Sequence, residues 1–258
     1  MNIEKFTKNI LKVIKPSTEL FSIKNKEFHI ETECLFGEEF EVLKIKDKLC
    51  YGRLLTDNYK GWLSYDDLGN SYKTNHRVLS LRTIVYEKED IKSKALMYLP
   101  LGSQIHVSSK GKTLFKILLD KKQKKFGYVS KQHLIQLSNK IKDWVSVAES
   151  FVNTPYKWGG RNSLGIDCSA LVQLSLQAGG INIPRNSSEQ KLFGKLVLKK
   201  LNNIERGNLI FWDGHVGIII DRDKMIHSNM FNMKVSVEKT IDVVERIGKP
   251  YEIYKLNN

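Results

Sequence analysis

The chain of 258 residues is long enough to form one large domain or two to three small ones, each with a hydrophobic core. Its 41% hydrophobic and 27% charged residues are typical of a soluble globular protein, and no segment approaches the roughly 18 consecutive apolar residues of a membrane span. The net charge of +14 allows a polyanionic partner, but most basic residues are lysines scattered among acidic ones. The dense cluster KKQKK at 121–125 is typical of a hairpin tip, so we expect no nucleic-acid partner.

The three cysteines Cys34, Cys50 and Cys168 lie far apart and form no CxxC pair. A sparse, odd set gives neither a disulfide framework nor a zinc motif, which favours a reducing compartment. The N-terminus, MNIEKFTKNILKVIKPSTEL, has no apolar core of signal-peptide length. We therefore expect a cytoplasmic protein with no membrane span, in preference to a periplasmic or extracellular one.

The first half consists of short apolar runs separated by turn signals. Residues 40–45 alternate as a strand does, with polar breaks at 46–48 and 56–58. The segment LFGEEFEVLKI…KGWLSYDDL (35–68) then recurs as LPLGSQIHVSS…FGYVSKQHL (99–134). This repeat predicts two copies of a small β-barrel. The alternative is one irregular all-β domain.

The pattern changes near residue 139. Residues 168–178 predict a buried helix with Asp167 as N-cap and Gly179-Gly180 as terminator. An amphipathic helix that ends before Pro155 is predicted ahead of it by six apolar side chains at helical spacing: Ile141, Trp144, Val145, Ala148, Phe151 and Val152. Strands are expected at 208–212, 215–221, 224–230 and 251–256. Helices followed by antiparallel strands describe an α+β domain.

Cys168 falls at the N-terminus of the second predicted helix. A buried cysteine can simply be a packing residue. At a helix N-terminus, however, the helix dipole lowers a thiol pKa and makes the thiolate a nucleophile. The helix alone does not decide between the two.

Two histidines favour catalysis. His215 begins one predicted strand and His227 ends the next, so an antiparallel pair places them across from one another, as a base and its orienting group require. The other four histidines are expected to be surface or turn residues: His29, His76, His106 and His133. Cys168, His215 and His227 could instead hold zinc with a water. Since no element supplies two ligands at motif spacing, we expect neither a metal nor a cofactor.

Four segments in this part resemble the signature blocks of the NlpC/p60 cysteine peptidases, in family order: TPYKWGGRNSLGIDCSALVQ (154–173), IPRNSSEQ (183–190), RGNLIFWDGHVGIII (206–220) and MIHSN (225–229). The repeated segments of the first half resemble bacterial SH3-like (SH3b) domains. The resemblance implies an α+β, papain-like catalytic domain over 139–258. Two small SH3-like β-barrels would precede it, at 1–72 with an N-terminal extension and at 73–138.

The same resemblance implies a role for individual residues. Cys168 would be the nucleophile, His215 the general base and then acid, and His227 the residue that orients His215. Substrate would be bound by Tyr156, Trp158, Asp167, Ser169, Arg185 and Ser187, with Asp167 and Ser169 at a free α-amine and Tyr156 able to assist the oxyanion. The acidic partner of the amine could also come from Glu27, Glu31 or Glu33.

The implied substrate is a muropeptide, cut between γ-D-Glu and the diamino acid, with a free N-terminal L-Ala, in murein peptide recycling. Rival readings are an inactive muropeptide- or cell-wall-binding protein and a thiol acyltransferase on the same fold. The sequence gives neither the preferred diamino acid nor the oligomeric state.

Overall fold

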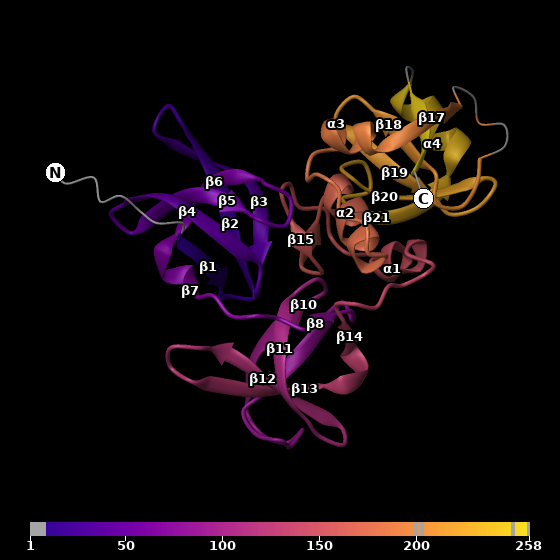
Figure 1. Cartoon of the computed structure of the whole chain (residues 1–258). Coiled ribbons are helices and arrows are strands. Elements are labelled where there is room, and N and C mark those ends of the chain that lie inside the picture. The colour runs from indigo at the N-terminus through magenta and orange to yellow at the C-terminus, as the bar shows by residue number, and fades with distance from the viewer. Residues whose placement is uncertain (1–8, 199–200, 202–203, 249–250, 257–258) are drawn as a thin grey trace. The chain divides into compact units, whose positions relative to one another are not determined.

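The computed structural model describes residues 9–198, 201, 204–248 and 251–256, and its contacts divide the chain into two compact units, 1–139 and 140–258. Figure 1 shows the order of the elements. The N-terminal extension expected before the first barrel includes residues 1–8, which lie outside the described residues. Among the described helices, none is both long and apolar enough to cross a membrane.

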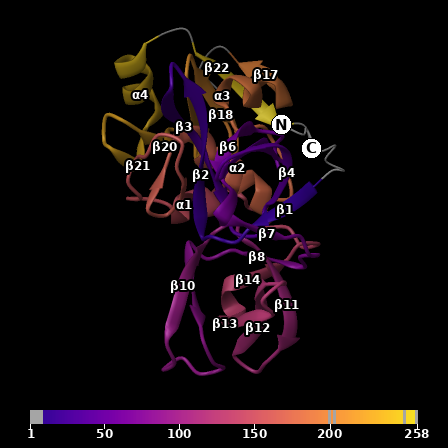
Figure 2. The same ribbon diagram turned by 90° about the vertical axis from the view of Figure 1, so that its left-hand side faces the viewer.

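Two seven-stranded sheets form the first unit. The strands of the first sheet are β1 (Asn9–Val13), β2 (Ser17–Lys24), β3 (Glu27–Leu35), β4 (Glu39–Lys46), β5 (Leu49–Leu54), β6 (Lys60–Ser64) and β7 (Leu68–Asn70). Those of the second are β8 (His76–Val78), β9 (Arg82–Tyr86), β10 (Ala95–Pro100), β11 (Gln104–Lys110), β12 (Leu114–Asp120), β13 (Lys125–Ser130) and β14 (Leu134–Gln136). Figures 1 and 2 show from two directions that β8–β14 curve around one centre.

The strand order confirms the repeat. The first sheet runs β3-β2-β6-β5-β4-β1-β7 and the second β10-β9-β13-β12-β11-β8-β14, which is the same order shifted by seven strands. In both sheets, a short 3-10 turn links the two strands that come last in the chain. Residues Tyr65–Asp67 link β6 to β7, and Lys131–His133 link β13 to β14. Two barrels, not one irregular domain, therefore make up the first half.

The repeated glycine before each aromatic has a packing reason. A Cβ on Gly61 would come within 2.7 Å of Leu20 Cγ, and one on Gly127 within 2.3 Å of Val85 Cγ1. Each glycine thus lets a core side chain of the neighbouring strand cross over its strand. The predicted turns also form, with left-handed residues at Asp47 and Asn58.

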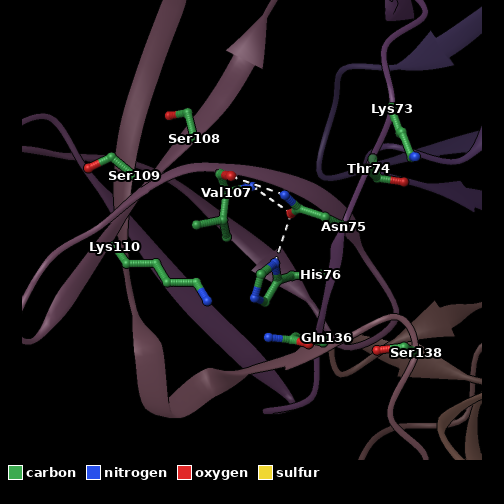
Figure 3. A pocket seen from close by; sticks show the side chains of 10 residues that line it. All are labelled: Lys73, Thr74, Asn75, His76, Val107, Ser108, Ser109, Lys110, Gln136 and Ser138. Carbon is green, nitrogen blue, oxygen red and sulfur yellow. Dashed lines mark hydrogen bonds between the residues drawn. The ribbon is translucent and has the colours of Figure 1, made fainter.

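His76 corrects one expectation. It lies in β8 and is 6% exposed, not a surface or turn residue. Its Nδ1 is 2.8 Å from Asn75 Oδ1, and the Asn75 side chain in turn pairs with both backbone groups of Val107 (Figure 3). These contacts form the floor of a cavity of about 550 Å³ whose rim carries Lys73 and Lys110. Strand β8 has only three residues, which is too short for an alternating pattern in the sequence to predict that His76 is buried.

Phe36 joins the two barrels. It directly follows β3 of the first barrel, yet it is fully buried in the core of the second with Val78, Val85 and Ile105. Its carbonyl accepts a hydrogen bond from Gln104 N at 2.8 Å. The adjacent Gly37 has φ +78° and no room for a Cβ, which would meet Gln104 O at 1.7 Å. The turn after β3 is therefore a structural part of both barrels.

The second unit is a six-stranded antiparallel sheet with helices. The sheet order is β17-β22-β18-β19-β20-β21. Its strands are β17 (Gly194–Leu198), β18 (Leu209–Trp212), β19 (His215–Ile219), β20 (Lys224–Asn229), β21 (Lys234–Lys239) and β22 (Glu252–Leu256). A small hairpin is formed by β15 (Arg161–Asn162) and β16 (Gly165–Ile166). The helices are α1 (Val145–Ser150), α2 (Cys168–Ala178), α3 (Ser187–Gln190) and α4 (Thr240–Ile247). This confirms the α+β class.

Helix α2 forms as predicted, but α1 is shorter than its apolar spacing indicates. Its Val145–Ser150 turns leave Val152 40% exposed. Ahead of it, Ile141 N–H donates to Ala178 O at the end of α2 instead of entering a helix. Behind it, Asn153 has φ +69°. Tertiary hydrogen bonding thus overrides the helical period at both ends.

We predict that Phe36→Ala lowers the free energy of unfolding by about 3–5 kcal/mol, because it removes a fully buried aromatic ring from the second barrel. Phe28→Ala is the matched control, since Phe28 in the first barrel is 62% exposed and should cost about 1 kcal/mol. Urea denaturation followed by circular dichroism measures both. Equal losses would contradict the role of Phe36 as a shared core residue.

Candidate active site

Helix α2 fixes the position of Cys168. Asp167 caps it, accepting a hydrogen bond from Ala170 N at 2.8 Å, and Cys168 is its first residue. Every residue of α2 is buried, and the helix packs on β19 and β20 (Figure 1). Cys168 itself is 8% exposed. As the first residue of a helix, it also has a backbone N–H without a partner inside that helix.

The two histidines meet on neighbouring strands. His215 Nε2 and His227 Nδ1 are 2.8 Å apart. The register of β19 and β20 pairs Ile218 with Ile226, so the histidines are diagonal neighbours and not directly opposite. A diagonal pair on one face still lies within reach of long side chains. The contact that the sequence predicted is present, but His215 is offset by two residues from the position directly opposite His227.

Sequence reasoning missed Glu238. Its Oε2 is 2.9 Å from His227 Nε2, the nitrogen that faces away from His215. Glu238 lies on β21, which had no predicted strand, although its alternation in KVSVEK is a weak signal. His215, His227 and Glu238 thus form a row across three successive strands, and Cys168 lies next to β19, where the backbone of Val216 hydrogen-bonds to its sulfur.

Asp167, Ser169 and Arg185 form one buried cluster. Arg185 donates to Asp167 Oδ1 at 2.9 Å and Oδ2 at 2.5 Å, and to Ser169 Oγ at 2.7 Å. Gly159 N, Ser169 Oγ and Ala170 N also donate to the Asp167 carboxylate. With five donors on its two oxygens, Asp167 is helix cap and ion-pair partner at once.

The remaining expected residues are placed differently. Burial, together with the proximity of Cys168 and Asp167, raises the pKa of the Tyr156 hydroxyl to about 12, so the group stays protonated beside them. Trp158 is 68% exposed. Ser187 lines a cavity of about 340 Å³ with Trp212 and Gly214, the residue before His215.

Burial controls the protonation of Cys168 and His215. It raises the pKa of Cys168 to about 11, with Asp167 adding to the rise and a backbone hydrogen bond from Val216 opposing it. It lowers the pKa of His215 to about 3, with His227 and Arg246 adding to the fall. The expected lowering of the thiol pKa by the helix dipole is therefore outweighed by burial. The resting pair is a neutral thiol and a neutral imidazole.

The same geometry argues against a zinc centre. Two nitrogens that share one tetrahedral zinc lie about 3.3 Å apart, given zinc–nitrogen bonds near 2.0 Å. The facing nitrogens of His215 and His227 are closer, at a hydrogen-bond distance of 2.8 Å. They bind each other, which is the arrangement of a base and its orienting group. A thiol at a helix N-terminus beside such a pair defines a papain-like cysteine hydrolase.

Comparison with known proteins agrees with this class. Residues 153–245 match the NlpC/P60 family, and residues 27–68 match the bacterial dipeptidyl-peptidase Sh3 domain. The second unit therefore belongs to the NlpC/P60 family of peptidases, and the first barrel is a bacterial SH3 domain.

Relatives extend the comparison over most of the chain. The γ-D-glutamyl-L-lysine dipeptidyl-peptidase of Bacillus subtilis is 28% identical over 225 residues, covering 77% of this chain and 72% of that protein. Dipeptidyl-peptidase 6 of Lysinibacillus sphaericus is 30% identical over 95 residues, or 36% of this chain and 34% of its own length. The matched part thus spans about a third of the Lysinibacillus protein. An NlpC/P60 family protein from Bacillus cereus has the same fold, with a TM-score of 0.80 over 96% of this chain and 99% of that one at 18% identity.

We predict that Cys168 is a thiol in the free protein near neutral pH. Because its pKa is raised, the thiolate appears only as the pH rises toward 11. The ultraviolet absorbance of the thiolate, taken as wild type minus Cys168→Ala, should be absent near neutral pH and grow in alkali. A constant thiolate band from neutral pH upward would contradict burial as the controlling factor.

Proposed function

We propose that this chain is a cysteine endopeptidase that hydrolyses the γ-D-glutamyl–diamino acid bond of peptidoglycan stem peptides. The 2.8 Å contact between His215 and His227, beside Cys168 at the start of α2, carries the proposal. The names of the relatives support the substrate class, since one acts on γ-D-glutamyl-L-lysine and another is a dipeptidyl-peptidase.

Acylation begins with proton transfer from the Cys168 thiol to His215. The sulfur attacks the γ-carbonyl carbon of D-Glu, a C–S bond forms, and the carbonyl π electrons move to its oxygen. The backbone N–H of Cys168 and the Tyr156 hydroxyl, which stays protonated, can donate to that oxyanion. When the intermediate collapses, the C–N bond breaks and His215 returns its proton to the departing amine.

Deacylation repeats the steps with water. His215 takes a proton from a water molecule while the oxygen of that water attacks the thioester carbonyl carbon. The C–S bond then breaks, and the proton on His215 returns to the sulfur. The products are a peptide ending in D-Glu and a free thiol, so atoms and charges balance.

A free N-terminal L-Ala is part of the proposal. The dipeptidyl-peptidase names of two relatives and of the barrel family support it, because such enzymes work from a free amino end. The Asp167 carboxylate is already neutralised by Arg185 in a pair 2% and 9% exposed. We therefore propose that an ammonium there is bound by acceptors in addition to Asp167.

We further propose that the enzyme works in the cytoplasm, in recycling of muropeptides. All three cysteines, each within the described part of the chain, are free and buried, which suits a reducing compartment.

We predict that the wild-type protein releases L-Ala-D-Glu from L-Ala-γ-D-Glu carrying either meso-diaminopimelate or L-Lys. Cys168→Ala should lose at least about 10³-fold in kcat because no nucleophile remains. Cys50→Ala, which removes a buried thiol of the first barrel, is the matched control and should retain activity. Mass spectrometry of the products measures all three.

An N-acetylated copy of each peptide tests the free-amine requirement, and the proposal expects it to resist cleavage. Equal cleavage of both copies would remove the amine requirement and leave the peptidase. Folded wild-type protein that cuts neither copy would overturn the proposed function and favour a binding protein.

A further inference from the structure

The carboxylate of Glu238 accepts from every neighbour it contacts. Its Oε2 receives hydrogen bonds from Asn232 Nδ2 at 2.6 Å and from Ser236 Oγ at 3.1 Å, and it lies 2.9 Å from His227 Nε2. Its Oε1 lies 2.8 Å from Arg246 Nη1. A carboxylate with four such neighbours is ionised and has no proton to give. The hydrogen between Glu238 and His227 therefore belongs to His227 Nε2.

Arg246 and its surroundings hold this carboxylate. The Arg246 guanidinium stacks 4.1 Å above the ring of Phe231 and is 26% exposed, while Glu238 is 18% exposed. Partial burial raises the pKa of Glu238, but hydrogen bonds from Arg246 and His227 outweigh it and lower that pKa to about 2. Glu238 thus remains an acceptor across the working range of an enzyme.

We propose that Glu238 is a positioning residue that fixes the tautomers of His227 and His215 in series. With its proton on Nε2, neutral His227 has a lone pair on Nδ1, which can only accept. His215 must then donate from Nε2 across the 2.8 Å contact. The lone pair of His215 is left on Nδ1, the free nitrogen that can take the Cys168 proton. The proposal rests on the cysteine-peptidase activity proposed above.

The charged and titratable groups around the row leave both histidines with lowered pKa values. His215 faces His227 from β19, Glu238 faces it from β21, and Arg246 approaches from α4. Burial and the positive charge of Arg246 both lower the pKa values of His215 and His227, whereas Glu238 opposes the fall at His227. Both histidines are therefore neutral at rest, and a neutral pair is defined by its tautomers.

Glu238→Gln is the decisive substitution. A glutamine keeps the shape, but its oxygen can turn to Arg246 and leave the NH₂ group facing His227 Nε2. His227 would then carry its proton on Nδ1 and donate to His215, whose own proton would move to Nδ1 and block it as a base. We expect kcat to fall about 10²-fold or more with KM changed by less than about threefold, because general-base catalysis and not binding is lost.

Glu245→Gln is the matched control. It removes the same charge from an exposed residue next to Arg246 on α4 and should leave kcat within about twofold of wild type. Glu238→Asp, which keeps the charge, should recover part of the lost activity. Arg246→Met should raise the pKa of Glu238 and of both histidines, and so move the acid limb of the kcat profile to higher pH.

Nitrogen-15 NMR of the imidazoles gives a readout that a merely structural role would not move. In wild type, His215 and His227 should both be the Nε2–H tautomer, and in Glu238→Gln both should become Nδ1–H. Signals are assigned by their loss in His227→Gln and His215→Gln. Folding of each variant is checked by circular dichroism. If Glu238→Gln fails to fold, the tautomers of the wild-type histidines and the pH dependence of kcat in Arg246→Met test the proposal instead.

Unchanged tautomers and a kcat within about twofold of wild type in folded Glu238→Gln would overturn the proposal. So would an Nδ1–H tautomer of His227 in the wild-type protein. Should wild type cut no stem peptide, the proposed function fails, while the tautomers still test Glu238.

Discussion

The burial of the reacting groups is the constraint on which the site depends. Helix α2 is buried along its whole length, so Cys168 at its start meets the backbone of β19 in a dry environment. Burial disfavours both the thiolate of Cys168 and the imidazolium of His215, so both groups are neutral at rest. Charge then has to develop during the reaction, where oriented groups stabilise it best. The surrounding structure must therefore orient these groups. The N-terminus of α2 does so on one side, and the row of side chains across β19, β20 and β21 does so on the other.

Two carboxylate–guanidinium pairs supply that orientation. Asp167 with Arg185 anchors the first turn of α2 beside Cys168, and Glu238 with Arg246 anchors the far end of the histidine row. In each pair the arginine neutralises a carboxylate that is also needed as an acceptor, for Ala170 N in one case and His227 Nε2 in the other. Breaking such a pair leaves an uncompensated charge, which is costly when buried. All four residues of these two pairs lie in the second unit.

The sequence predicted the parts whose signal is local. Alternation and glycine-centred turns gave the two barrels, and the N-cap, apolar run and terminal glycines gave α2. The sequence also predicted that His215 and His227 lie close together, because one begins a strand and the other ends the next strand of an antiparallel pair. It failed where tertiary contacts decide. Ile141 bonds to the end of α2 and shortens α1, Phe36 serves the barrel it does not belong to, and His76 is buried in a three-residue strand. Glu238 was missed because a charged residue in a weakly alternating segment is typical of a solvent-exposed strand. Its contact with His227 arises only from the pairing of β21, the edge strand of the sheet, with β20.

The central claim is that Cys168 forms a covalent thioester with the γ-glutamyl group. Rapid quenching in acid during the first turnovers, followed by mass spectrometry of the digested protein, tests it most directly. The account predicts an added L-Ala-γ-D-glutamyl mass on the peptide that contains Cys168, rising before product accumulates and decaying as substrate is consumed. Two results together would contradict it. The wild-type protein would release product steadily with no adduct on that peptide at any time, and the Cys168→Ala variant would remain active.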